Sequence, residues 1–366
     1  MRAVAVYPQK REVKLIERAE PRIVSPNEVR IRMLEVGVCG TDKELCAFVF
    51  GTPPPGSDHY ILGHESLGEV SEVGRGVKDL RPGDLVVGSV RLPCADAACQ
   101  ACRTDHQDFC STGKHREHGI KSLDGFMADV VVEDRAWLHL VPPTLREVAV
   151  LVEPLTIAEK SFHEAVNIQS RLPWNLSGRQ SSQPRALVLG AGAVGLLGAM
   201  KLIHEGYQTY IYSRQPEPNP KATIAKLIGA VYISSRETSV DEMAARVGGI
   251  DLVYEALGAA QLAFDVLKVL APNGVYAFTG IPRAERLEPF DTLGVIENLV
   301  LRNQAIVGIV NAGPQAFADA VRDLSVFHAR WPGALEAMIT GRYPMEEFLD
   351  PVMGCTGGIK NVIRIG

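Results

Sequence analysis

Four of the seven cysteines in this 366-residue chain lie close together, with the spacing of a metal site. They are Cys94, Cys99, Cys102 and Cys110, separated by four, two and seven residues. Four thiolates at this spacing complete the tetrahedral coordination of one zinc ion and leave no open position, which predicts a structural zinc. The odd number of cysteines and their clustering argue against a secreted disulfide scaffold.

A second group of residues combines the ligand types of a catalytic zinc. Cys39 begins the run Cys-Gly-Thr-Asp, His64 and Glu65 follow a glycine, and Glu153 opens a helical stretch. A thiolate, an imidazole and a carboxylate give zinc three protein ligands and leave one position open for a substrate. Singly, each residue has an ordinary structural role, as a buried thiol, a core histidine or a charge at a helix N-terminus. Their joint occurrence with the four cysteines favours a catalytic metal.

A glycine-rich turn predicts a dinucleotide site. It has the pattern Gly190-x-Gly192-x-x-Gly195, between a predicted buried strand at 185–189 and a predicted helix at 196–206. Glycines let the backbone approach a pyrophosphate, and a helix N-terminus supplies N–H donors and a positive dipole. A turn that only packs a helix on a strand is the alternative, and the flanking strand–helix–strand pattern disfavours it.

The residues after the next predicted strand indicate the type of cofactor. An NAD site has Asp or Glu there to bind the ribose 2′-hydroxyl. This chain has Ser213, Arg214 and Gln215 instead. A guanidinium suits a 2′-phosphate because it forms paired, charge-assisted hydrogen bonds, although a solvated loop arginine is the ordinary alternative. We expect NADP to be preferred and NAD to be accepted.

The elements that must position these groups change character along the chain. The pattern of residues 1 to about 150 predicts short strands between Gly and Pro turns, which is typical of a β-rich barrel or sandwich. A helical stretch follows at 153–166, and 175–184 has the composition of a polar linker. Beyond it, strands and helices alternate, which predicts an α/β fold with a doubly wound parallel sheet. The last 55 or so residues are helix-rich and return to a strand at 361–365.

Charge and hydropathy exclude several classes of protein. The formal net charge is −5, and Asp96, Asp105 and Asp108 lie in the cysteine loop, which argues against a nucleic-acid-binding zinc protein. No secretory signal opens the chain, and the longest uncharged apolar run, 186–200, is too short to span a bilayer. We expect a cytoplasmic protein with no membrane and no nucleic-acid partner. A non-catalytic protein that binds zinc and a dinucleotide is a further alternative, disfavoured because it would not need Cys39, His64 and Glu153 together.

Together these motifs resemble those of the zinc-dependent medium-chain dehydrogenases/reductases, over nearly the whole chain. Four stretches, 119–127, 152–161, 213–218 and 305–311, are similar to the microbial glucose 1-dehydrogenases within that superfamily. The resemblance implies a GroES-like β-barrel catalytic domain with a structural zinc lobe over 1–184 and a Rossmann NAD(P)-binding domain over 185–311. It also implies a C-terminal segment, 312–366, that returns to the catalytic domain.

The resemblance also implies roles for particular residues. Cys39, His64 and a carboxylate from Glu65 or Glu153 would hold the catalytic zinc, the two carboxylates exchanging with water or substrate. Thr41 would stand beside the reacting oxygen, and the sugar hydroxyls would contact Glu117, Glu153 and Asn311, although pattern alone places Glu117 in a solvated polar loop with His115 and His118. The implied cofactor contacts are Gly190, Ala191, Gly192, Ala193, Val194, Gly195, Ser213, Arg214, Gln215, Phe278, Thr279, Gly280, Ile309, Val310 and Asn311.

The activity implied by the resemblance is zinc-dependent oxidation of an aldose at C1, D-glucose to D-glucono-1,5-lactone, with hydride transfer to NADP or NAD. A homo-oligomer, dimer or tetramer, is implied as well. Two departures bear on the substrate: Ile157 replaces a polar residue and Leu301 a histidine that some close members carry. Because both changes remove sugar contacts, a polyol, threonine or alcohol dehydrogenase of the same superfamily is the alternative.

Overall fold

The computed structural model describes residues 1–366 except 174–182, 283–288 and 290. It divides into two compact units, residues 1–156 with 311–366, and residues 157–310. The sequence placed the first boundary later, between 184 and 185. Helix α3 (Val152–Gln169) runs without a break across the structural division, so no turn signal marks it. Residues 175–182 of the predicted linker lie outside the described residues.

The first unit consists mainly of β-strands. Its largest sheet has the order β11-β6-β5-β3-β19-β18, with β10 also paired to β3, and two three-stranded sheets have the orders β2-β1-β4 and β7-β8-β9. The strands are β1 (Arg2–Tyr7), β2 (Glu12–Glu17), β3 (Glu28–Gly37), β4 (Tyr60–Ile61), β5 (Glu65–Val73), β6 (Leu85–Gly88), β7 (Arg91–Leu92), β8 (Arg116–His118), β9 (Ser122–Leu123), β10 (Val130–Asp134), β11 (Leu138–Val141), β18 (Ile339–Pro344) and β19 (Lys360–Arg364).

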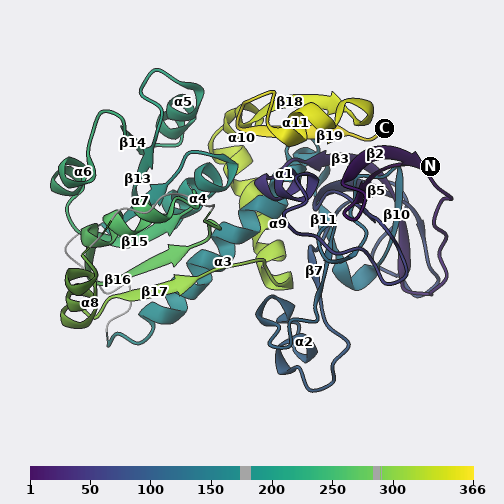
Figure 1. The fold of residues 1–366 in the computed structure, drawn as a ribbon, viewed down its shortest axis with the longest axis horizontal. Coiled ribbons are helices and arrows are strands. Elements are labelled where there is room, and N and C mark those ends of the chain that lie inside the picture. The colour runs from purple at the N-terminus through teal and green to yellow at the C-terminus, as the bar shows by residue number, and fades with distance from the viewer. Residues whose placement is uncertain (174–182, 283–288, 290) are drawn as a thin grey trace. The chain divides into compact units, whose positions relative to one another are not determined.

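The C-terminal segment completes the large sheet of this unit. Strand β19 pairs antiparallel with β3, placing Val362 opposite Gly37, so residues at the two ends of the chain share one sheet. The helices of the unit, besides the first turn of α3, are α1 (Gly40–Cys46), α2 (Gln100–Arg103), α9 (Pro314–Arg330), α10 (Ala334–Met338) and α11 (Leu349–Met353). Figure 1 shows α2 in a lobe that projects from the strands of this unit.

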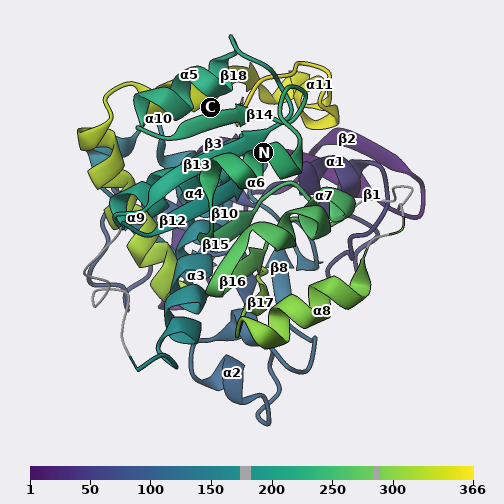
Figure 2. The ribbon, with the colours of Figure 1, turned by 90° about the vertical axis from the view of Figure 1, so that its left-hand side faces the viewer.

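Among its described residues, the second unit contains a six-stranded parallel sheet in the order β14-β13-β12-β15-β16-β17, which Figure 2 shows strand by strand. Numbered from the first strand of the unit, this is the order 3-2-1-4-5-6 of a doubly wound Rossmann sheet. The elements are β12 (Arg185–Leu189), α4 (Ala193–His204), β13 (Gln208–Ser213), α5 (Pro220–Leu227), β14 (Val231–Ser234), α6 (Val240–Val247), β15 (Ile250–Glu255), α7 (Ala260–Asp265), β16 (Leu270–Phe278), α8 (Thr292–Leu301) and β17 (Ala305–Gly308).

Burial explains why these segments form strands. All six residues of β15 are buried, as expected of a central parallel strand covered on both faces. In the first unit, alternate residues of β3, such as Val29 and Ile31, enter a core with Phe126 and Met127. No helix in the described part of the chain combines the length and apolar character needed to cross a membrane.

Candidate functional site

Cys39 and His64 are brought together at the start of α1. Cys39 precedes the first residue of the helix, and its backbone N–H donates to Asp42 Oδ2 at 2.8 Å. The other oxygen of this fully buried carboxylate, Oδ1, lies 3.3 Å from His64 Nδ1. A carboxylate beside one ring nitrogen orients a histidine so that the other nitrogen can ligate a metal. Burial lowers the pKa of His64, but Asp42 and Cys39 outweigh it and raise that pKa well above the usual value.

Glu65, the first residue of β5, completes this group. Donor atoms of Cys39, His64 and Glu65 all lie within 4.8 Å of one another. Glu65 is also paired with a cation, because Lys360 Nζ lies 2.7 Å from Oε1 and 2.6 Å from Oε2, and both side chains are buried. Lys360 donates in addition to the carbonyl of Val38 at 3.0 Å. A metal at this site would therefore share Glu65 with an ammonium group.

Glu153 lies in the first turn of α3 and is the second carboxylate of the site. Its side chain is partly exposed. Desolvation, followed by the negative charge of Glu65, raises the pKa of Glu153 to about 7, while His64 and Lys360 act in the opposite direction. The two carboxylates thus differ, since Glu65 is neutralised by Lys360 and Glu153 is poised to exchange a proton near neutral pH.

The donor set fits zinc. The thiol of Cys39, the imidazole of His64 and the carboxylate of Glu65 lie together, and Asp42 orients the imidazole. These are the ligand types of a zinc site with an open position. Glu153 is not part of this group, although its carboxylate interacts electrostatically with Glu65 and His64. Thr41 is the second residue of α1 and is partly exposed.

The four cysteines of the projecting lobe also form one cluster. Their sulfur atoms lie within 4.8 Å of one another, and Cys99 Sγ is 3.9 Å from Cys110 Sγ. Cys94, Cys99 and Cys102 are buried. The backbone N–H of Cys102 lowers the pKa of Cys99 to about 6, whereas burial raises the pKa of Cys102. The cluster fits a closed, four-thiolate zinc site.

Two of the three residues implied to bind sugar hydroxyls contact each other. Asn311 Nδ2 donates to Glu117 Oε1 at 2.9 Å, although the residues are 194 positions apart. Glu117 lies in β8 and is buried, as is His118, so the solvated loop expected from pattern alone does not describe them. Asn311 has the left-handed backbone that Asn tolerates better than most residues, with φ of 57°.

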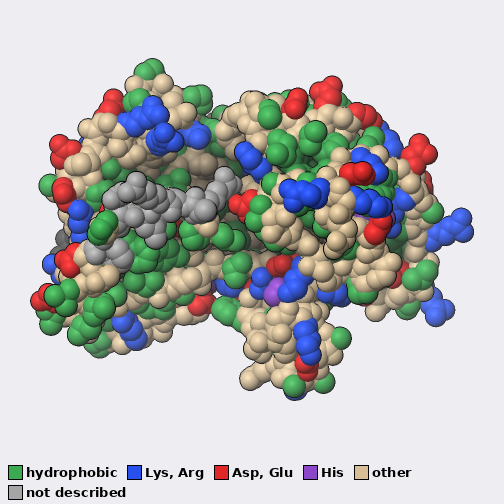
Figure 3. All heavy atoms as spheres, viewed as in Figure 1, with side chains coloured by type: hydrophobic (Ala, Val, Ile, Leu, Met, Phe, Trp, Pro, Cys, Tyr) green, Lys and Arg blue, Asp and Glu red, His purple; other side chains and the backbone are tan. Residues whose placement is uncertain are grey.

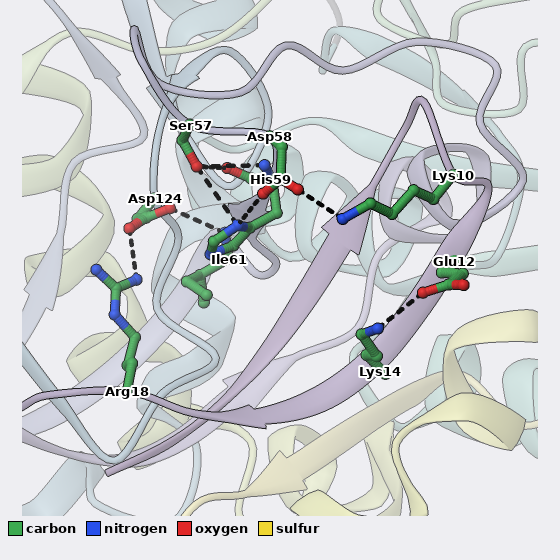
Figure 4. A network of polar contacts seen from close by, with 9 residues as sticks. All are labelled: Lys10, Glu12, Lys14, Arg18, Ser57, Asp58, His59, Ile61 and Asp124. Atoms are coloured by element: carbon green, nitrogen blue, oxygen red, sulfur yellow. Dashed lines mark hydrogen bonds and ion pairs between the residues drawn. The ribbon is translucent and has the colours of Figure 1, made fainter.

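A polar network outside the site anchors the chain just before His64. Figure 4 shows Asp124 accepting a hydrogen bond from the backbone of Ile61 at 3.0 Å and pairing with Arg18 at 2.7 Å. The Asp124 carbonyl accepts from His118 Nδ1 at 2.7 Å, next to Glu117. Asp124 therefore ties the strand that leads to His64 to the strand that carries Glu117.

In the second unit, the glycine-rich turn joins β12 to α4. Gly190 has φ of 101°, which favours glycine, and its N–H donates to the carbonyl of Tyr212 at 2.9 Å. A side chain at Gly195 would place its Cβ 2.2 Å from the Gly190 carbonyl, so the helix packs closely on the turn. Ala191, Gly192, Ala193 and Val194 occupy the turn and the start of α4, where free N–H groups favour an anion.

The other predicted cofactor residues follow strands of the same sheet. Ser213 ends β13, and Arg214 and Gln215 after it are exposed. Phe278, Thr279 and Gly280 come at the end of β16, and Ile309 and Val310 follow β17. Since all strands are parallel, these residues and the glycine turn share the carboxyl edge of the sheet.

Three residues that the sequence did not single out shape these groups. Asp42 was recognisable, because it stands three residues after Cys39, at the spacing of a helix capping residue. Lys360 carried no signal, since it is 295 positions from Glu65. Glu255, buried at the end of β15, accepts from the N–H groups of Leu257 and Gly258 at 2.7 Å and of Gly280 at 3.0 Å.

Two family models match consecutive segments of the chain. Residues 25–143 match the alcohol dehydrogenase GroES-like domain, and residues 146–365 match the glucose dehydrogenase C-terminus. Together with the parallel sheet order, these matches confirm the predicted combination of a GroES-like β-barrel and a Rossmann domain.

The chain is also similar to individual proteins over its whole length. It is 38% identical to the glucose 1-dehydrogenase of Methanocella arvoryzae, with 100% of each chain covered, and 38% identical to that of Thermoproteus tenax, with 100% of this chain and 99% of the other covered. Among solved structures, it matches Haloferax mediterranei glucose dehydrogenase in complex with NADP, Zn and gluconolactone, with a TM-score of 0.86, 32% identity and coverage of 100% and 99%. The chain therefore belongs to the glucose dehydrogenase family of zinc-dependent medium-chain dehydrogenases.

Proposed function

We propose that this protein oxidises D-glucose at C1 to D-glucono-1,5-lactone with zinc and NADP, NAD being accepted as well. The observation that carries the proposal is the cluster of Cys39, His64 and Glu65 with Glu153 beside it, in a chain with a Rossmann sheet. The named activity of the relatives supports the same substrate. Glucose and NADP⁺ give the lactone, NADPH and one proton.

Residues of the first unit would bind and orient the sugar. Cys39, His64 and one carboxylate would hold zinc, whose charge lowers the pKa of a sugar hydroxyl. Thr41 would receive the C1 hydroxyl proton and pass it to solvent, which requires hydrogen-bond reach. Glu117, Glu153 and Asn311 would bind other hydroxyls.

The turn at 190–195 and the residues after β13, β16 and β17 would hold the cofactor, which accepts the hydride. Arg214 would pair with the 2′-phosphate, because no carboxylate stands at the end of β13 to bind a free 2′-hydroxyl. The exposure of Arg214 leaves its guanidinium accessible for this contact.

We also propose that two copies associate through the edge of the Rossmann sheet. Strand β17 is an edge strand in the described sheet. Next to it in the chain, α8 exposes Leu293, Ile296 and Val300 by 76%, 60% and 69%, an apolar stripe at helical spacing. Figure 3 shows hydrophobic side chains gathered over α8. Pairing with a second copy would cover this stripe.

A cytoplasmic location is consistent with the chemistry of the lobe. Its four cysteines form no disulfide, and an oxidising compartment would drive such neighbours toward disulfides and away from the thiolates that the proposed zinc site requires.

The test is the absorbance of reduced nicotinamide, with NADP or NAD and with glucose, galactose, xylose, sorbitol, threonine or ethanol. We expect reduction that depends on glucose and stops on chelation of zinc. Cys39→Ala should abolish turnover and lower zinc from about two to about one ion per chain, because the lobe keeps its own. Cys355→Ala, at an exposed cysteine, is the control.

Three other outcomes would contradict parts of this proposal. Activity retained in Cys39→Ala contradicts the zinc assignment. Activity on sorbitol or threonine alone favours the alternative of a polyol or threonine dehydrogenase, which Ile157 and Leu301 suggest. Bound zinc and cofactor without any turnover favours a non-catalytic protein.

A further inference from the structure

A buried arginine faces Glu117 across two short strands. In the β7–β8 register, Arg91 stands directly opposite Glu117. Arg91 Nε donates to Glu117 Oε1 at 2.9 Å, and Nη2 lies 2.9 Å from the same oxygen. Arg91 is 7% exposed and Glu117 8%. Each buried charge needs its partner, because removing one would leave the other uncompensated.

The remaining end of the guanidinium reaches the four-cysteine lobe. Arg91 Nη1 donates to the carbonyl of Asp108 at 3.0 Å, and Asp108 lies two residues before Cys110. A Cβ at Gly313 would lie 2.9 Å from Asp108 Oδ1, so the same lobe residue also packs near the segment that carries Asn311. Arg91 thus links the lobe to Glu117 through a planar group with fixed donor directions.

These contacts distinguish the two oxygens of Glu117. Oε1 receives Arg91 and Asn311 Nδ2, at 2.9 Å each, while Asn311 Oδ1 accepts from the N–H of Ala312 at 3.0 Å. Oε2 has no hydrogen bond from any residue that the structure describes. With Oε1 fully used, Oε2 is the oxygen left to accept from a ligand hydroxyl.

We propose that Arg91 is a positioning residue for sugar recognition. It holds Oε1 of Glu117 so that Oε2 meets one sugar hydroxyl, and the lobe fixes Arg91 through the Asp108 carbonyl. The four-cysteine lobe therefore acts on substrate binding as well as on local stability. This inference rests on the proposed oxidation of glucose.

Arg91→Met and Arg91→Lys test the proposal by steady-state kinetics with glucose and with its 2-deoxy, 3-deoxy and 6-deoxy analogues. We expect Arg91→Met to raise the KM for glucose by about 10- to 100-fold, with kcat changed by a few-fold, and to leave the KM for NADP and the zinc content unchanged. Arg91→Lys should raise the KM for glucose less than Arg91→Met does, since one ammonium can reach Glu117 but cannot also reach the lobe carbonyl.

The deoxy sugars identify the hydroxyl concerned. The wild type should discriminate strongly against the analogue that lacks the hydroxyl bound by Glu117. Arg91→Met should lose most of that discrimination and keep its preference at the other positions. A residue that only stabilises the fold would not alter selectivity at one hydroxyl.

Arg342→Met is the matched control. Arg342 Nε donates to buried Glu35 at 3.0 Å and Nη2 donates to the carbonyl of Glu147 at 2.5 Å, the same combination of contacts in the same unit. It should lower the melting temperature and leave the KM for glucose unchanged.

The inference is overturned if the wild type oxidises glucose and both Arg91 variants keep its KM and its deoxy-sugar selectivity. Should Arg91→Met fail to fold, Arg91→Lys decides by the same criterion. A wild type without sugar oxidation instead contradicts the proposed function.

Discussion

At the scale of single residues, the proposed zinc site contains two carboxylates with different surroundings. Glu65 is held by Lys360, whereas desolvation and the charge of Glu65 leave Glu153 with a pKa of about 7. Near neutral pH, Glu153 can therefore gain or lose a proton while Glu65 stays paired. This difference suits a site in which one carboxylate exchanges with water or substrate.

The first prediction concerns zinc affinity. A proton on Glu153 competes with metal, so the wild-type affinity at the catalytic site should carry an additional tenfold loss for each pH unit below about 7. Glu153→Gln removes the titrating carboxyl group, so the zinc affinity of this variant should lack the additional loss at low pH. Competition with a chelator between about pH 5.5 and 8.5 measures the zinc affinity of the wild type and of the variant. The zinc of the four-cysteine lobe is the internal control. Equal slopes in the two proteins would contradict the role of Glu153.

The second prediction concerns cofactor choice. Arg214→Gln should lower kcat/KM with NADP by about 10- to 100-fold, because one charge-assisted contact is lost. It should leave kcat/KM with NAD nearly unchanged. Arg246→Gln, at an exposed arginine of α6, is the control. Equal losses with both cofactors would mean that Arg214 does not recognise the 2′-phosphate.

At the scale of elements, helix α9 packs on strand β11 through an aromatic pair. The ring of His139 stacks on Phe317 with centroids 4.5 Å apart, and Nε2 lies 2.9 Å from Ser89 Oγ. Burial, followed by the charge of Arg135, lowers the pKa of His139 to about 4. The C-terminal segment is thus joined to the large sheet by a histidine that is neutral in the folded state.

The third prediction follows from this pKa. The unfolded chain takes up a proton near pH 6.5 and the folded chain only near 4, so stability present above about 6.5 is lost as the pH falls toward 4. The loss is on the order of 3 kcal/mol in the free energy of unfolding. His139→Phe keeps the stack and should flatten this dependence in denaturant titrations, at a constant cost from the lost hydrogen bond to Ser89.

His204→Gln, at an exposed histidine, is the control for that experiment. It should retain the wild-type dependence between pH 6.5 and 4. A His139→Phe variant with the same pH dependence as wild type would show that another group is responsible.

At the scale of the whole molecule, the α8 stripe sets the fourth prediction. Ile296→Glu with Val300→Glu places two charges on the stripe and should halve the mass measured by light scattering, because burying them would leave both unpaired. Leu227→Glu on α5, beside the opposite edge of the sheet, should leave the mass unchanged. A wild type that is already monomeric would contradict the proposed association.

The sequence alone predicted the features encoded by neighbouring residues. The cysteine spacing, the glycine turn between β12 and α4, and the alternation of strands and helices all act over a few residues, where backbone geometry and ligand spacing are set locally. Helix α4 begins at Ala193, three residues earlier than expected, because the glycine turn itself supplies the first helical residues.

Only the tertiary structure decided which distant residues meet. Lys360 neutralises Glu65 because β19 pairs with β3 beside the start of β5, and Asn311 reaches Glu117 across 194 positions. In the smaller sheet, the register of β7 and β8 places Arg91 opposite Glu117, so an expected solvated loop is a buried, charged network. Periodicity reports which face of a segment is buried, but the pairing of faces depends on strand order and register, which emerge only when the whole chain has packed.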